Sequence, residues 1–258
     1  SYMQAGLVCE FITREFGPEK IVGMLSEFKE GADTSQAVRR VLEMAPEEFD
    51  DRFNDFVTRE FSELLDHLDE WKKLHQTAVK ALAEEDWPDA LEAAEQAVEI
   101  FPEYVESDSP MLFMATALSK LGNDEAELNI LHEYWQKGGY APEAIWLLAR
   151  KFYNRGKKSQ AIEVLDSLNL VDPFDAELHS TLGDWLSEED RLTDALVEYE
   201  VALAMNPHDM AAAYYRIANV NHRLKQYDEA RKNVLAALEI APHYRPAQKL
   251  LLETTKTQ

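Results

Sequence analysis

Alanines recur along this chain at a nearly constant spacing, and this spacing constrains the fold more than any other feature. Successive marks lie 36, 35, 34 and 35 residues apart, at Ala90, Ala126, Ala161, Ala195 and Ala230. A proline follows twelve residues after four of these marks, at Pro102, Pro173, Pro207 and Pro242. A period of this length is typical of helix–turn–helix repeats, in which each unit buries its apolar face against its neighbours. The sequence therefore predicts an all-α fold with five repeats over residues 69–242.

The segment 175–207 shows the repeat most clearly. Gly183, Ala195 and Ala202 are small residues at positions where two helices would touch, and Tyr199 is one of the large residues that would fill the space between them. This pattern resembles the tetratricopeptide repeat (TPR) family, and its copies cover about two-thirds of the chain. The resemblance implies a right-handed solenoid in which the first helix of each repeat lines a concave groove.

The second repeat, over residues 108–138, departs from the pattern. Ala126 fits the pattern, but the turn before it is one residue short, and Glu133 stands where a small residue is expected. Gly138 and Gly139 replace the closing proline. We therefore expect a longer or tilted second helix there, and a regular third repeat over residues 142–173. Residues 243–258 are predicted to form a capping helix, with Leu250 and Leu251 covering the open end and Glu253, Lys256 and Gln258 in water.

Residues 1–68 are predicted to form a separate helical subdomain. Amphipathic spacing and turn signals indicate helices over residues 3–16, 19–28 and about 34–44, followed by a long helix that begins at Pro46. Cys9, the single cysteine, is expected to pack on the apolar face of the first helix, and one cysteine excludes an intramolecular disulfide. The long helix carries an apolar stripe that needs a partner surface: Phe49, Phe53, Phe56, Val57, Phe61, Leu64, Leu65 and Leu68.

Residues 1–60 carry a second resemblance, in the order of their helices and in their turn residues. A Tyr-containing helix leads to an FG-E-K turn, then to a G-DT-QA turn and a closing EEFD--F helix. This order resembles the helical tail of gluzincin-type zinc metallopeptidases. The resemblance implies that an HExxH helix and a zinc-binding glutamate lie upstream of Ser1 in a longer protein, and that Tyr2 lies near that site. The alternative is that Tyr2 simply begins a helix.

Charge and hydropathy exclude several classes of partner. The formal net charge is −23, from 26 basic and 49 acidic residues, so the surface repels phosphate backbones and nucleic-acid binding is not expected. No run of 18 apolar residues is present, so direct membrane insertion is not expected either. The compartment stays open, because both a cytoplasmic and a bacterial periplasmic location are compatible with these residues.

No catalytic, metal-binding or cofactor motif emerges from the sequence. None of the seven histidines has a partner at i+4, the spacing that places two ligands on one face of a helix. The segment 132–136 comes nearest, but Gln136 stands where a second histidine would be needed. The segment 155–159 lacks the earlier glycine and the preceding strand of a phosphate loop. We therefore expect no cofactor and no enzymatic activity within these residues.

The best candidate site is a peptide-binding groove. In TPR arrays the second, fifth, ninth and twelfth positions of the first helix point into the concave groove. The resemblance therefore implies which residues of this chain line that groove. The alternative is that Trp146 and Tyr215 pack against adjacent helices. A two-carboxylate clamp is not expected, because His75 and Val79 replace its Lys and Asn. The candidate groove residues are Trp146, Arg150, Tyr153, Asp184, Tyr215, Arg216, Asn219 and His222, with Glu143, Glu177, Ser180, Ser187 and Ala212 at the remaining positions.

These observations lead to three hypotheses. The first is a protein–protein interaction scaffold that binds a peptide or a partner domain in the groove. The second is the non-catalytic C-terminal part of a zinc metallopeptidase, suggested by residues 1–60. The third is a structural array that associates with itself. Rings and amides on the groove positions favour the first hypothesis, because aromatic side chains supply contact area and amides satisfy a peptide backbone.

Overall fold

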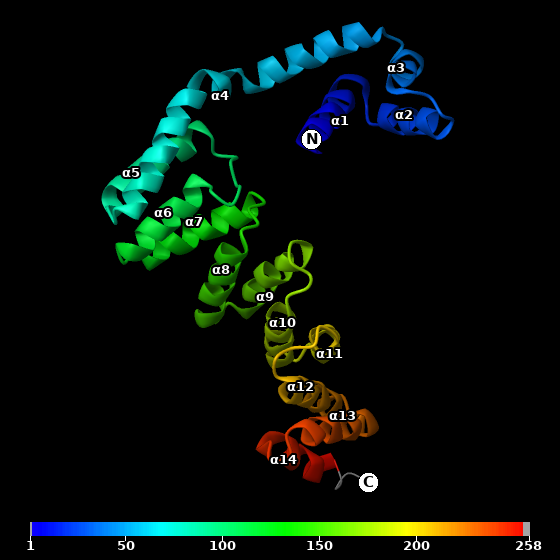
Figure 1. The fold of residues 1–258 in the computed structure, drawn as a ribbon, viewed down its shortest axis with the longest axis vertical. Helices are drawn as coiled ribbons and strands as arrows, with labels where there is room; N and C mark the ends of the chain where they lie inside the picture. Colours follow the sequence, from blue (N-terminus) through cyan, green and yellow to red (C-terminus); the bar gives the residue numbers. More distant parts are fainter. Residues whose placement is uncertain (1, 255–258) are drawn as a thin grey trace. The chain divides into compact units, whose positions relative to one another are not determined.

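The computed structural model describes the backbone of residues 2–254 and the side chains of residues 5–62 and 65–254. Every regular element in these residues is helical, which confirms the predicted all-α class (Figure 1). The chain divides into two compact units, residues 1–73 and 74–258. The predicted boundary at residue 68 stays a prediction, as do the limits of the five repeats. Tyr2, Leu64, Lys256 and Gln258 have side chains outside the described set.

The first unit consists of short helices followed by the start of a long one. Gly17 takes a left-handed φ of 95° between the first two helices, a conformation that glycine adopts without strain. Asp33 and Gln36 form a capping box, in which the Asp33 carboxylate accepts from the Gln36 backbone N–H at 2.8 Å. The elements are α1 (Tyr2–Phe16), α2 (Glu19–Lys29), α3 (Thr34–Ala37), the π-helical turn η1 (Val38–Leu42) and α4 (Pro46–Ala83).

Phe11 lies at the centre of the core of this unit. Its side chain is 1% exposed, and its ring centroid lies 5.4 Å from that of Phe49 and 5.3 Å from that of Phe56. The predicted stripe of α4 is therefore buried over its first turns, whereas Leu65 is 55% exposed. The expectation for Cys9 is wrong, because its side chain is exposed. The buried face of α1 follows Phe11 and Ile12, and a residue two positions before Phe11 points away from that face.

The long helix α4 contributes residues to both compact units. We predicted a helical subdomain that ends at residue 68 and repeats that begin at residue 69, but α4 runs without a break over 38 residues, Pro46–Ala83. No glycine or proline interrupts it after Pro46, so nothing in the local sequence ends the helix between the two segments. The boundary between the compact units falls inside α4, after Lys73.

The second unit consists of helix pairs joined by turns of one kind. Each turn within a pair holds one residue in the left-handed region, with φ between 59° and 76°, and an alanine follows five positions later except after Gly122. Ala90, Ala161, Ala195 and Ala230 at that later position are 0% exposed. The helices are α5 (Trp87–Ile100), α6 (Pro110–Lys120), α7 (Asp124–Gln136), α8 (Pro142–Asn154), α9 (Lys158–Asp166), α10 (Ala176–Glu188), α11 (Leu192–Ala204), α12 (Met210–Arg223), α13 (Tyr227–Ile240) and α14 (Arg245–Thr254).

The turn geometry corrects the register of the second repeat. Its left-handed residue is Gly122, so the position five residues later is Glu127 and not Ala126. Glu127 is 1% exposed, whereas Ala126 is only half-buried. The turn is therefore of normal length, and a carboxylate occupies a position where the other repeats have alanine. The second helix, α7, has 13 residues, the same length as α11, so the expectation of a longer helix is wrong.

The same register explains the missing proline at the end of the second repeat. Twelve residues after Glu127 stands Gly139, at the place of Pro173 and Pro207 in the following repeats. A Cβ atom on Gly139 would lie 2.3 Å from the ring of Tyr134, which is fully buried. Glycine is needed here because a large side chain fills the space, and the Tyr134 hydroxyl accepts from the Ala141 backbone N–H at 3.1 Å.

The third repeat is less regular than we predicted. Its second helix, α9, ends after nine residues at Asp166, and a 3-10 turn η2 (Ser167–Leu170) continues the chain. The Ser167 hydroxyl donates to the Val164 carbonyl at 2.6 Å, a local bond that competes with the α-helical ladder. At the end of the array, Leu250 is buried and Leu251 is half-buried, while Glu253 is exposed. The capping role of residues 243–258 stays a prediction.

We expect replacement of Phe11 by Ala to lower the free energy of unfolding of the first unit by about 3–5 kcal/mol, because a buried ring is lost and a cavity remains. Hydrogen–deuterium exchange of the full chain measures this locally. Exchange should accelerate in peptides from residues 5–62 and stay unchanged in peptides from residues 110–250. Unchanged protection of α1 and α4 would contradict the central role of Phe11.

Gly183 and Tyr199 form a matched small–large pair between α10 and α11. A Cβ atom on Gly183 would lie 2.5 Å from the Tyr199 ring, although the equivalent positions 149 and 218 are alanine. Gly183→Ala should therefore destabilise the protein by roughly 1–3 kcal/mol, despite the higher helix propensity of alanine. In a double-mutant cycle by thermal denaturation, Tyr199→Leu should remove most of that cost. Additive effects of the two substitutions would refute the pairing.

Candidate functional site

The candidate groove residues lie on three helices, α8, α10 and α12, each of which is the first helix of a pair. Their starts are fixed by sequence signals. Pro142 occupies the first turn of α8, where a missing N–H costs nothing. Asp175 accepts from the Glu177 backbone N–H at 2.8 Å, and Asp209 accepts from that of Ala212 at 2.9 Å. Side-chain caps of this kind set the first residue of a helix and hence the direction of every later side chain.

Asp184 connects three helices in this region. The Arg216 guanidinium on α12 donates through Nε to Asp184 Oδ1 at 3.0 Å and through Nη2 to Oδ2 at 3.3 Å. The Tyr199 hydroxyl on α11 donates to Asp184 Oδ1 at 2.7 Å. A two-point Arg–carboxylate bond fixes the plane of both groups, so Arg216 is held in one orientation before any partner arrives. Burial, followed by the charge of Asp184, raises the pKa of Tyr199 well above its ordinary value.

A cavity of about 420 Å³ opens beside this network. The rings of Tyr215 and Tyr244 meet edge to face at a centroid distance of 5.4 Å on its wall. Four of the eight candidate groove residues, Asp184, Tyr215, Arg216 and Asn219, come together here with Ser187 and Ala212 from the remaining groove positions, although they lie on two different helices. We call this space the α10–α12 cavity. It is lined by Asp184, Ser187, Glu188, Tyr199, Ala212, Tyr215, Arg216, Asn219 and Tyr244.

Tyr153 lies next to this cavity but does not line it. Its ring stacks on that of Trp185 with a centroid distance of 4.5 Å and an interplanar angle of 12°. Its hydroxyl donates to Glu188, which also lies 3.1 Å from the Lys158 ammonium. The hydrogen bond from Tyr153, together with Lys158, lowers the pKa of the Glu188 carboxyl. Glu188 therefore carries its negative charge at the edge of the cavity at neutral pH.

The structure does not bring the other four of the eight candidate groove residues into the cavity. Arg150 lies 4.9 Å above the Trp146 ring and 3.6 Å from Glu177, and His222 meets the ring of Tyr227 at 5.5 Å. Trp146 is half-buried against the main core, as Tyr215 is against α14, so both side chains pack within the protein and still keep exposed surface. Their part in binding stays a prediction.

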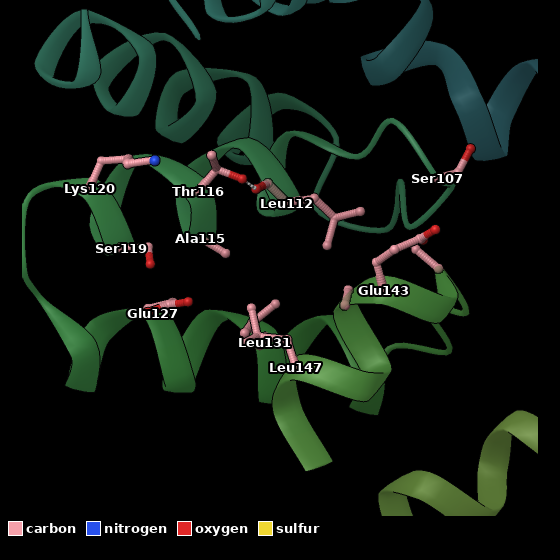
Figure 2. A pocket seen from close by; sticks show the side chains of 12 residues that line it. Ser107, Leu112, Ala115, Thr116, Ser119, Lys120, Glu127, Leu131, Glu143 and Leu147 are labelled. Carbon is pink, nitrogen blue, oxygen red and sulfur yellow. Dashed lines mark hydrogen bonds between the residues drawn. The ribbon is translucent and has the colours of Figure 1, made fainter. Parts of the chain in front are cut away.

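A second cavity, of about 430 Å³, lies between α6, α7 and α8, and the sequence analysis did not identify it. Figure 2 shows Leu112 and Thr116 of α6 facing Glu127 and Leu131 of α7, with α8 closing one end. Applying the same groove positions to the second repeat in its corrected register would have selected Leu112, Thr116 and Ser119. We call this space the α6–α8 cavity. It is lined by Ser107, Leu112, Ala115, Thr116, Ser119, Lys120, Glu127, Leu131, Ala141, Glu143, Ala144 and Leu147.

The histidines that sequence analysis considered have structural contacts. His75 bonds to the Asp108 carbonyl at 2.9 Å and packs on Phe113, so it is not presented as a clamp residue. His132 stacks on Trp135 and meets Phe152 edge to face. Over the described residues, no three side chains of His, Cys, Asp or Glu gather closely enough to hold a metal ion. Within that same part of the chain, no helix is both long and apolar enough to cross a membrane.

Comparison with known proteins places this fold among the TPR solenoids. The structure of YrrB, a TPR protein with an unusual peptide-binding site, aligns with 72% of this chain and 96% of its own at a TM-score of 0.52 and 15% identity. A structure of the MamA protein aligns with 66% of this chain and 90% of its own at a TM-score of 0.48 and 20% identity. The likeness to YrrB shows the fold, and at this identity it concerns the fold alone. The array is a TPR-type helix–turn–helix solenoid.

Sequence comparison adds one curated relative. Protein O-mannosyl-transferase TMTC1 of Homo sapiens is 29% identical over 136 residues, which are 51% of this chain. The chain spans only 15% of the length of that protein. No family model matches the chain. None of these comparisons supports the resemblance of residues 1–60 to a metallopeptidase tail.

The raised pKa of Tyr199 leads to a prediction about alkaline pH. Because the folded protein favours the neutral phenol, its stabilising effect is fully present below about pH 10, the pKa of an unfolded tyrosine, and is lost as the pH rises towards the folded pKa. Tyr199→Phe should therefore lower the free energy of unfolding by about 1–3 kcal/mol at pH 8, and this difference should shrink between pH 10 and pH 11. Urea unfolding at several pH values measures it. Parallel pH profiles would contradict the assignment.

Proposed function

We propose that this protein is a protein–protein interaction scaffold that binds a peptide or a partner domain on the face formed by the first helices α8, α10 and α12. The observation that carries the proposal is the α10–α12 cavity, where Tyr215, Arg216 and Asn219 converge on one space beside Asp184. Clefts that combine apolar rings with a few oriented polar groups are the usual form of a binding site. Four of the eight candidate groove residues line it.

The side chains in this cavity suit an extended segment of a partner. Tyr215 and Tyr244 supply rigid apolar area at a low entropic cost. The Asn219 amide has donors and an acceptor that match a peptide backbone. Arg216 is held by Asp184, so little conformational freedom is lost on binding. The formal net charge of −23 favours a basic partner and predicts faster association at low salt.

The likeness to YrrB supports this proposal, since that protein has the same kind of fold and a peptide-binding site. A ligand with two terminal carboxylates is a poor candidate here. At the corresponding positions of the first repeat, His75 contacts Asp108 and Val79 is 44% exposed without any side-chain donor. The acidic surface would also repel a ligand that carries two carboxylates. We therefore favour internal or basic segments as ligands.

The direct test is selection of random dodecapeptides displayed on phage against the full chain, followed by fluorescence anisotropy with the enriched peptides. We expect the double variant Tyr215→Ala, Asn219→Ala to weaken binding by at least about tenfold, because both residues occupy a central pocket. Leu235→Ala on α13 is the matched control, since Leu235 is 50% exposed on a second helix and should leave affinity unchanged.

Two results would overturn the proposal. One is the absence of any enriched peptide. The other is peptide affinity that is equal for the wild type and for a double variant whose circular dichroism and melting temperature are unchanged. Sedimentation velocity over a range of concentrations separates the alternative of a self-associating array, in which the chain forms larger species without added peptide.

A further inference from the structure

The α6–α8 cavity points to a second binding site with its own chemistry. We propose that it receives one aliphatic side chain of a partner peptide, of the size of leucine, isoleucine or methionine, with a basic residue beside it that contacts Glu143. The inference rests on the proposed function, because it names the ligand chemistry of another part of the first-helix face. The cavity measures about 430 Å³, within the range of roughly 300–1,000 Å³ typical of ligand pockets.

One small residue borders the cavity on α8. Ala144 stands at the third position of this helix, where the fourth repeat has Leu178, which is 1% exposed, and the fifth repeat has Ala213. In the fourth repeat the leucine side chain is part of the core. In the third repeat the missing side chain leaves space between α6 and α8, bordered by Ala115 and Leu131 (Figure 2). An aliphatic side chain from a partner would fill the volume that leucine fills in the fourth repeat.

Two polar groups in the walls, Thr116 and Glu127, already have partners within the protein. The Thr116 hydroxyl donates to the Leu112 carbonyl at 2.8 Å. The Glu127 carboxylate, 1% exposed, accepts from the Lys151 ammonium at 2.7 Å, so its charge is balanced by an adjacent cation. An occupant therefore gains little from these groups. Its binding free energy comes from covering apolar surface in the cavity. Leu147 offers such surface, because its side chain is 41% exposed.

The charged residues at the rim of the cavity indicate which kind of partner residue lies next to the aliphatic one. Lys120 lies 5.7 Å above the Trp87 ring, a contact that favours the cation where it is. Glu143 is exposed at the opposite end of the cavity and forms no ion pair within the part of the chain that the structure describes (Figure 2). Because the whole chain carries a formal net charge of −23, a basic residue is the complement that Glu143 and its surroundings favour.

Two substitutions test the two parts of this proposal on the same selected dodecapeptides. Ala144→Leu places in the cavity the side chain that the next repeat already holds, and it should weaken peptide binding by at least about tenfold. Glu143→Lys reverses the rim charge and should lower affinity for peptides with a basic residue next to the aliphatic one. In the peptide itself, replacing the aliphatic residue by alanine should weaken binding to the wild type and have little effect on Ala144→Leu.

The exposed Leu147 provides a second variant in case Ala144→Leu does not fold. Leu147→Gln changes a side chain that is 41% exposed, so the fold should persist while apolar contact area is lost. Peptides enriched on the wild type without an aliphatic residue would overturn the proposal. So would affinities that neither Ala144→Leu nor Leu147→Gln changes.

The same experiment separates this inference from the proposed function. Peptides that depend on Tyr215 and Asn219 but are insensitive to changes at Ala144 and Leu147 would leave the scaffold function standing and refute the second site. Peptides that depend on all four residues would support both sites on one continuous surface. If no peptide binds the wild type, both proposals fail.

Discussion

The structure of the array depends on one steric constraint, the close contact between the two helices of each pair. This contact requires a small residue five positions after the left-handed turn residue, and alanine meets the requirement at positions 90, 161, 195 and 230, where it is fully buried. A close approach of two helices excludes large side chains at the contact and makes their neighbours interlock. Where a larger residue takes this position, as Glu127 does in the second repeat, its side chain bonds to a neighbouring helix.

The second and fourth repeats show how large side chains are accommodated between helices. In the second, Glu127 replaces the small residue and bonds to Lys151, while Tyr134 fills the end of the repeat and requires Gly139. In the fourth, Tyr199 is large and requires Gly183. Glu127 lines the α6–α8 cavity and Tyr199 lines the α10–α12 cavity.

Much of the fold could be predicted from spacing alone, because one small residue per repeat is a strong and local signal. The error at Ala126 arose because two adjacent residues compete for one position, and a buried carboxylate is rare enough that alanine was the natural choice. Only the left-handed turn at Gly122 resolves the ambiguity. The continuity of α4 was missed for a related reason, since a domain boundary inside a helix leaves no glycine or proline as a signal.

The candidate site was predicted in part. Repeat positions identified Asp184, Tyr215 and Asn219, because those positions depend only on the register of first helices. They could not identify Tyr199 or Tyr244, which reach the same cavity from a second helix and from a loop. Nor could they show that the ring of Tyr153 is covered by Trp185. Contacts between side chains from different repeats depend on three-dimensional packing, which a linear spacing does not contain.

The central claim is that partners bind along the first helices of the array. Amide chemical-shift mapping of the isotopically labelled chain, titrated with a selected peptide, tests it most directly. The account predicts that the largest shifts fall on α6, α8, α10 and α12, with maxima near Leu147 and Asn219. Shifts confined to the second helices α7, α9, α11 and α13, or to residues 5–62, would contradict it.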